Sequence, residues 1–144
     1  MALFKNIYEG FPWYSSGGTG FVDADDIAKA MVLLMESSIS AERYIISAEN
    51  IPYKNLFFMI ADAFGKPRPH KPVTPFIASV VWRLEKLKSW FSKKEPLITK
   101  ETAATALAVA DFNHAKLLQA LPSFRYTPLE KSVMAICQHI LKNL

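Results

Sequence analysis

The sequence predicts an α+β protein that is mainly α-helical, with about six helices and two to four short strands. Three observations predict this fold class. Apolar residues recur at helical spacing in several stretches of the chain. Residues 17–47 have the pattern of a glycine turn, a very short strand, a capped helix and a second strand. Residues 66–75 hold four prolines, which block a helix and predict an extended arm.

Residues 17–47 are the centre of the prediction. Asp23 suits the N-cap position because its carboxylate can accept a backbone N–H that the helix leaves unpaired. Asp25 and Asp26 fall in the first turn, where negative charge complements the helix dipole. One strand–helix–strand unit cannot make a covered parallel sheet, so we expect a part of a larger fold. The helix carries a predicted apolar stripe of Ile27, Met31, Leu34 and Met35, and residues 43–46 favour a strand.

The other elements follow from local signals. Gly10 and Gly65 are placed to end two helices in the left-handed conformation. Asp111 or Asn113 can cap a helix that ends at Leu121. Residues 127–130, Thr-Pro-Leu-Glu, predict a capping box at the start of the last helix. Further helices are predicted over residues 3–10, 52–65, 75–91, 99–106 and 127–140, with a short strand over residues 107–110. Their inward side chains are predicted to include Phe76, Val80, Leu129, Val133, Ile136, Cys137 and Ile140.

Bulk composition narrows the class of protein. A chain of 144 residues, 51% of them hydrophobic, has room for one domain with a core. The net charge of +4 is mild, and no nucleic-acid partner is expected. The single cysteine, Cys137, is expected to be a buried small hydrophobe and indicates a reducing compartment. With no apolar leader and no run of about 18 apolar residues, we expect a cytoplasmic protein.

The chain carries no recognisable catalytic, cofactor or metal constellation. Residues 17–20 lack the G-x-G-x-x-G spacing and are expected to be a flexible turn, with a phosphate nest as the alternative. No tyrosine is followed four residues on by lysine, so the Tyr/Lys pair of dehydrogenases is absent. His70, His114 and His139 are far apart, and the helix start explains the three aspartates, so no metal is expected.

Residues 66–94 form a basic section that includes Trp82 and Trp90. Its simplest interpretation is a solvated basic face with the aromatic residues in the core. A surface that faces a nucleotide or an acidic substrate comes second. A membrane-surface helix comes third, and a membrane partner is therefore not expected.

Six segments of the chain resemble, in order, the motifs of one family. They are residues 18–30 (F-V-x-x-D-D-[VI]-A-x-A), 42–47 (G-E-R-Y-I-L), 56–65 (I-A-x-A-x-G-K-P), 97–101 (P-x-L-T-x-E), 111–118 (D-x-S-K-A-x-x-L-G) and 124–130 (P-x-x-[ST]-L-E-E-[AGS]). The fifth departs from its motif, because His114 and Ala115 are shifted and no glycine follows Leu121. Together they resemble the C-terminal part of the extended short-chain dehydrogenase/reductases, in the NAD-dependent epimerase/dehydratase and dihydroflavonol-reductase-like branch. The cofactor glycines and the Tyr-x-x-x-Lys pair of that family lie upstream of these motifs. The resemblance thus implies an excised C-terminal fragment of a Rossmann-type α/β protein, with Met1 not native.

The resemblance also implies a division of labour within the chain. Residues 1–48 would be the last strand, helix and strand of the truncated Rossmann-type domain, and residues 49–144 a helical substrate-binding domain. The parent would be an NAD(P)-dependent oxidoreductase, epimerase or dehydratase acting on a nucleotide sugar or a related carbonyl or hydroxyl compound. NAD or NADP would bind the parent and not this chain, which is expected to be inactive alone. By position, the substrate-cleft candidates are Thr19, Phe21 and Val22, with Arg68 and His70 as weaker candidates for anionic substrate groups.

The partners implied are the missing N-terminal nucleotide-binding domain and a small-molecule substrate. Without that domain, parts of residues 3–14 and 27–35 should expose apolar surface and cause self-association. Two other function classes remain open from the residues. One is a stand-alone helical protein-interaction module, and the other is a basic peripheral membrane-binding domain that uses residues 66–94.

Overall fold

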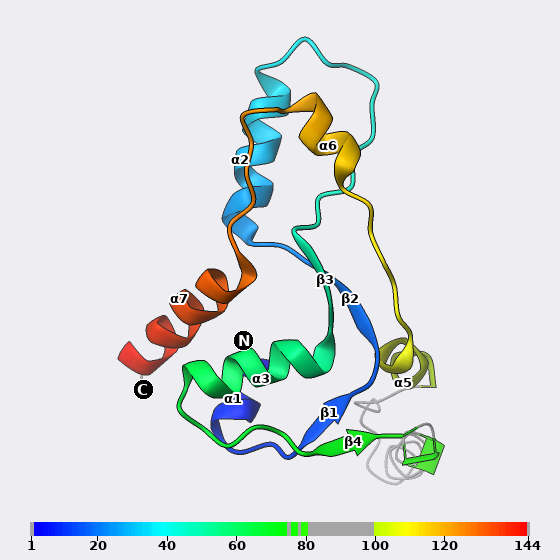
Figure 1. Cartoon of the computed structure of the whole chain (residues 1–144), viewed down its shortest axis with the longest axis vertical. Coiled ribbons are helices and arrows are strands. Elements are labelled where there is room, and N and C mark those ends of the chain that lie inside the picture. Colours follow the sequence, from blue (N-terminus) through cyan, green and yellow to red (C-terminus); the bar gives the residue numbers. More distant parts are fainter. Residues whose placement is uncertain (1, 75, 78, 81–99, 144) are drawn as a thin grey trace, which may run out of the picture. The chain divides into compact units, whose positions relative to one another are not determined.

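The computed structural model describes residues 2–74, 76–77, 79–80 and 100–143 (Figure 1). The chain forms two compact units, each built from two separate stretches. The first unit comprises Met1–Gly18 and Pro52–Val109, and the second comprises Thr19–Ile51 and Ala110–Leu144. The mainly helical α+β class is confirmed, while the division at residue 48 stays a prediction. Most of the helix predicted over residues 75–91, with its basic continuation, lies outside the described residues.

The first unit has helices against a short parallel ribbon (Figure 1). Helix α1 (Ala2–Tyr8) packs on α3 (Tyr53–Ala63), and the rings of Tyr8 and Phe64 meet edge to face at 5.3 Å. Both helices end before a predicted glycine, Gly10 at φ +88° and Gly65 at φ +63°. Strand β1 (Trp13–Ser15) pairs in parallel with β4 (Lys71–Val73), so the predicted extended arm is confirmed. The buried apolar residues of the unit include Ile7, Leu56, Ile60, Ala61 and Phe64.

The flexible turn predicted over residues 17–20 is wrong, because Gly18, Thr19 and Gly20 belong to strand β2 (Gly18–Phe21). A close backbone approach fixes the start of this stretch. Gly17 donates its N–H to the carbonyl of Ala106 at 3.2 Å, and Gly18 donates to Ala108 at 3.0 Å. A Cβ on Gly17 would lie 2.5 Å and 2.4 Å from those two carbonyl oxygens, so only glycine fits there. Helix α5 (Lys100–Leu107) confirms the helix predicted over residues 99–106 within one residue. The strand predicted over residues 107–110 is reduced to a single bridge between Gly18 and Val109.

The second unit is a helical cluster joined to one strand pair. Strand β2 (Gly18–Phe21) pairs with β3 (Glu49–Pro52), and α2 (Ala24–Met35) begins at the predicted N-cap, Asp23. Helices α6 (Ala115–Ala120) and α7 (Leu129–Lys142) complete the unit. Its core consists of Ala30, Leu117, Leu121 and Phe124, with Leu33, Leu34, Tyr44, Ile46, Leu118 and Tyr126 partly buried against them.

The strand predicted over residues 43–46 is wrong. These residues have no strand structure, and β3 lies a few residues later, at Glu49–Pro52. Tyr44 and Ile46 pack against the helical core instead of pairing with a neighbouring strand. Strand propensity is largely a preference for a packed, pleated surface, and here a helical core provides the packing.

The apolar stripe of α2 does not face the core as one surface. Ala30 is fully buried, whereas Ile27, Met31 and Met35 are 36%, 55% and 82% exposed. Exposure of apolar residues within 27–35 was expected, and it is confirmed. Three further inward predictions are wrong, because Phe76, Val80 and Ile136 are exposed.

Candidate functional site

Three of the predicted site residues lie together on and after β2. Thr19 and Phe21 belong to that strand, Val22 follows it, and all three are half-buried. The carbonyl of Phe21 accepts the N–H of Ala48 at 2.8 Å. This backbone hydrogen bond helps to hold the strand in position.

At Gly20, other side chains pack closely against the same strand. A Cβ there would lie 2.3 Å from the hydroxyl oxygen of Ser47 and 2.8 Å from the ring of Phe112. Asn50 fixes the Phe112 segment, because its amide nitrogen donates to the Phe112 carbonyl at 2.9 Å and its amide oxygen accepts the Phe112 N–H at 3.1 Å. Sequence reasoning missed Asn50, since nothing in its neighbourhood marks a contact with a residue 62 positions away.

Arg68 and His70 lie in the first unit and are exposed. Arg68 forms a bidentate ion pair with Asp62, with N···O distances of 2.8 Å and 2.7 Å. The hydrogen bonds and charge of this pair hold the pKa of Arg68 above, and that of Asp62 below, their ordinary values. Asp62 uses two of the five guanidinium N–H donors, and none of the other three is bonded to a residue that the structure describes. His70 donates its backbone N–H to the carbonyl of Pro12 at 3.0 Å.

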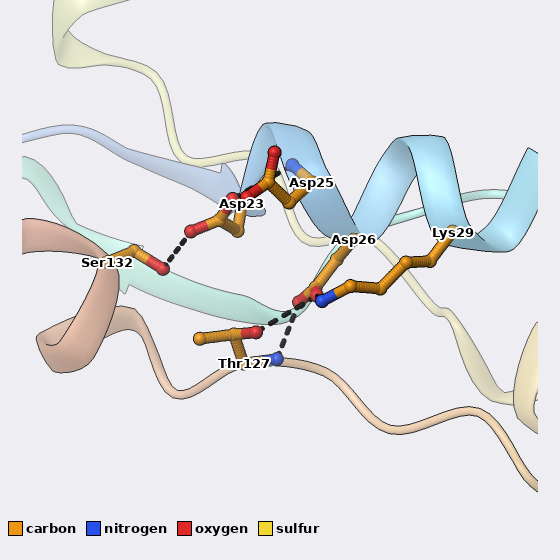
Figure 2. A network of polar contacts seen from close by, with 6 residues as sticks. All are labelled: Asp23, Asp25, Asp26, Lys29, Thr127 and Ser132. Atoms are coloured by element: carbon orange, nitrogen blue, oxygen red, sulfur yellow. Dashed lines mark hydrogen bonds and ion pairs between the residues drawn. The ribbon is translucent and has the colours of Figure 1, made fainter. Parts of the chain in front are cut away.

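The densest polar network of the second unit surrounds Asp26 (Figure 2). Its carboxylate is fully buried and accepts the backbone N–H of Thr127 at 2.5 Å and the Thr127 hydroxyl at 2.9 Å. Lys29, one turn further along α2, donates to the same carboxylate at 3.3 Å. Burial by itself would raise the pKa of Asp26, but the hydrogen bonds from Thr127 and Lys29 outweigh it and lower the pKa.

The capping box predicted at residues 127–130 is wrong. Pro128 occupies the N-cap position of α7 and makes no side-chain cap, while the Thr127 hydroxyl bonds to Asp26. Side chains from other parts of the unit accept hydrogen bonds from the first turn of α7. Glu49 accepts the N–H of Leu129 at 3.2 Å, and Asp23 accepts the hydroxyl of Ser132 (Figure 2).

The Asp26 network therefore acts as a structural clamp. A carboxylate whose pKa is lowered is ionised near neutral pH, so it has no proton to give, and it is a weaker base than an ordinary aspartate. Asp23 likewise serves structure, since it caps α2 through Asp25 N–H at 2.9 Å and contacts α7 through Ser132. Helix α6 has His114 at its N-cap position, without a side-chain cap, and not the predicted Asp111 or Asn113. The Asn113 side chain nevertheless accepts the N–H of Ala115 at 2.9 Å.

Two other kinds of functional group are a reactive thiol and a cluster of metal ligands. Burial raises the pKa of the Cys137 thiol to about 11, so it is protonated and inert, and its predicted role as a buried hydrophobe is confirmed. Within the described part of the chain, no group of three or more His, Cys, Asp or Glu residues could hold a metal ion. No helix in those residues is long and apolar enough to cross a membrane.

The fold has clear counterparts among solved structures. A nucleoside-diphosphate-sugar epimerase from Pseudomonas aeruginosa matches with a TM-score of 0.68 and 20% identity, over 92% of this chain and 39% of its own. The triphenylmethane reductase of a Citrobacter species matches with a TM-score of 0.63 and 19% identity, over 95% of this chain and 47% of its own. The same reductase solved with NADP(H) matches with a TM-score of 0.60 over 90% of this chain. No protein-family model and no curated protein sequence matches the chain.

These matches define the class of structure to which the chain belongs. It has the fold of one part of an epimerase or reductase of the Rossmann type, which confirms the resemblance to extended short-chain dehydrogenase/reductases at the level of fold. More particularly, it resembles the nucleoside-diphosphate-sugar epimerase and the triphenylmethane reductase. The chain spans less than half the length of each of these proteins.

Proposed function

We propose that this chain is the substrate-binding, C-terminal portion of an NAD(P)-dependent epimerase, dehydratase or reductase. The observation that supports this most is the match over at least 90% of the chain to an epimerase and to a reductase solved with NADP(H). The substrate class is a nucleotide sugar or a related carbonyl or hydroxyl compound. NAD or NADP would supply hydride transfer in the parent protein, and the groups described here supply binding.

Thr19, Phe21 and Val22 are the proposed substrate-cleft residues of the second unit. They are half-buried, so each presents part of its side chain to a ligand. Because Gly20 has no Cβ, Ser47 and Phe112 pack closely against the strand at this position. This packing holds the backbone of Thr19 and Phe21. None of these side chains is an acid, a base or a nucleophile activated by a neighbour, so they are binding and not catalytic residues.

Arg68 and His70 are the proposed contacts for anionic groups in the first unit. The ion pair with Asp62 orients the guanidinium and leaves three N–H donors for a phosphate or carboxylate. The exposed imidazole of His70 follows it two residues on, in the extended arm. The partner in this proposal is a nucleotide-binding domain, and the exposed apolar residues of α2 would cause self-association in its absence.

The test is ligand binding to the full chain, followed by backbone amide shifts in NMR. UDP-glucose is expected to shift the amides of residues 19–22, whereas NADH and NADPH shift none and no turnover occurs. Phe21→Ala should weaken UDP-glucose binding about tenfold by removing a ring contact. Phe11→Ala is the matched control, because Phe11 is an exposed aromatic residue outside the proposed cleft. Turnover by this chain, tight binding of NADH, or unchanged amides at residues 19–22 would refute the proposal.

A further inference from the structure

The first unit holds cations against the faces of aromatic rings. Lys54 lies 5.4 Å from the ring centres of both Tyr14 and Phe58, and Arg68 lies 5.2 Å from that of Phe58. The two rings meet edge to face at 6.1 Å. These four residues form one connected group, which we call the cation–aromatic cluster. Two further cations of the same unit lie over rings, Lys66 over Tyr8 at 4.6 Å and Lys71 over Trp13 at 5.5 Å.

The fold explains how this cluster forms. Lys54 and Phe58 are four residues apart on α3 and therefore lie on the same face of the helix. Tyr14 comes from β1, and Arg68 comes from the arm between α3 and β4. Asp62, one turn after Phe58, fixes Arg68 through the bidentate ion pair. Ring faces and a carboxylate therefore orient two long, otherwise mobile cationic side chains before any ligand arrives.

The charge of the cluster is only partly compensated. Asp62 neutralises Arg68, whereas no carboxylate among the described residues forms an ion pair with Lys54. The surrounding unit is basic as well, because its two stretches of sequence contain eleven lysines and arginines against five acidic residues. Such an excess of positive charge favours a multiply charged anion over a singly charged one.

We propose that the cation–aromatic cluster is a binding site for the phosphate groups of a phosphate ester. A guanidinium with free N–H donors suits two oxygens of a phosphate, and an ammonium supplies a second point charge. Both cations lie near the ring centre of Phe58, at 5.4 Å and 5.2 Å, so their charged atoms are at most about 11 Å apart and one diphosphate can contact both. In this proposal the rings orient the two charges. Lys54 is the new residue here, and nothing in the sequence analysis singled it out.

The inference deepens the proposed function, because Arg68 is already a proposed substrate contact there. It assigns the anionic part of the substrate to a phosphate and adds Lys54, Tyr14 and Phe58 to the site. It is nevertheless separable, since phosphate binding at this cluster requires neither turnover nor the cleft residues Thr19, Phe21 and Val22.

The experiment is calorimetric titration of the full chain with three probes: UDP, uridine and inorganic phosphate. UDP is expected to bind at least tenfold more tightly than uridine, with an affinity that falls as salt rises. Lys54→Gln should weaken UDP binding about tenfold, and Lys54→Arg, which keeps the charge, should restore most of it. The control is Lys116→Gln in the second unit, which also removes a lysine that lies over a ring, Tyr44, at 5.0 Å and pairs with an acid, Glu42. It should leave UDP binding unchanged.

The outcomes separate the two proposals. Equal binding of UDP by wild type and Lys54→Gln, with Phe21→Ala still weakening UDP-glucose, overturns the cluster and leaves the proposed function standing. Binding of uridine as tight as that of UDP also overturns it, because the contact would then be to the base. Inorganic phosphate that binds as tightly as UDP supports the site and identifies free phosphate as its ligand. Absence of binding by all three probes and by UDP-glucose overturns both proposals.

Discussion

The two units place an aspartate in opposite environments. In the first unit Asp62 pairs with Arg68 at the surface, with about half of each side chain exposed. The second unit buries Asp26 completely and surrounds it with donors from Thr127 and Lys29. Its sequence contains six basic and eight acidic residues, against eleven and five in the first unit. An aspartate whose ion pair is exposed to water can exchange that pair for another partner. A buried aspartate cannot do so without disrupting the fold.

The glycines show a second contrast between the units. Gly17 is packed against backbone carbonyl oxygens of Ala106 and Ala108, which belong to a fixed helix end. Gly20 is packed against the side chains of Ser47, Phe112 and Asn50. Side chains can turn away from an added methyl group and backbone cannot, so the two positions should tolerate substitution differently.

The largest expected effect is that of Gly17→Ala. The added Cβ would fall within 2.5 Å of two carbonyl oxygens, so the backbone itself must shift, and the free energy of unfolding should fall by about 3 kcal/mol. Gly20→Ala is the matched variant, and a loss of about 1–2 kcal/mol is expected because its neighbours can rotate. Urea unfolding of both variants measures the difference. A larger loss at Gly20 than at Gly17 would contradict the contrast between backbone and side-chain packing.

The next effect is that of Asp26→Asn in the buried clamp. The carboxamide offers one acceptor oxygen where the carboxylate offers two, so one donor of Thr127 is left without a partner. A loss of about 2–3 kcal/mol of unfolding free energy is expected. Asp25→Asn is the control, since Asp25 is exposed in the same helical turn and should change stability by less than about 0.5 kcal/mol. Equal losses for the two variants, measured by urea unfolding, would show that Asp26 contributes only helix-dipole energy.

The smallest expected effect is on the pH dependence of the unfolding free energy, to which the two units should contribute differently. The folded state lowers the pKa of Asp26 below its ordinary 3.8, so its contribution is complete above that value and is lost as pH falls through the folded pKa. Wild type should thus lose more unfolding free energy than Asp26→Asn between pH 5 and the acid end of the titration. Asp62 also has a lowered pKa, but its exposed pair is screened by salt.

Salt separates these two contributions. At about 1 M NaCl the pH dependence due to Asp62 should largely vanish, while that due to Asp26 persists. Unfolding midpoints of wild type, Asp26→Asn and Asp62→Asn across pH at two salt concentrations measure this. A pH dependence that salt abolishes in wild type would show that the buried carboxylate contributes nothing to it.

Local signals predicted the helices well and the strands poorly. Asp23 as an N-cap and the left-handed glycines Gly10 and Gly65 are decided within a few residues of chain, and all three are found. The strand predicted over residues 43–46 failed because a strand exists only where a partner lies beside it. The capping box at Thr127 failed for a related reason, because a buried carboxylate from a distant helix took its hydroxyl.

The candidate site was predictable only in part. The stretch around Thr19, Phe21 and Val22 was marked by its motif, and Arg68 by its charge in a proline-rich arm. Lys54 and Asn50 carry no such mark, since their significance comes from contacts with Phe58 and Tyr14 in one case and Phe112 in the other. Sequence spacing places Lys54 and Phe58 on one helix face, but the strand that brings Tyr14 to them is set by long-range pairing.

The sequence by itself determined the fold class, the helix limits set by caps and glycines, and the family that the fold resembles. Those features depend on steric limits and hydrogen bonds between residues close along the chain. Tertiary structure alone decided which residues pair as strands and which face of α2 is buried. It also made Asp26 a clamp, and it gave Lys54 no ion-pair partner among the described residues. These outcomes depend on which surface each side chain meets, and burial sets the energy of a charge more strongly than its residue type does.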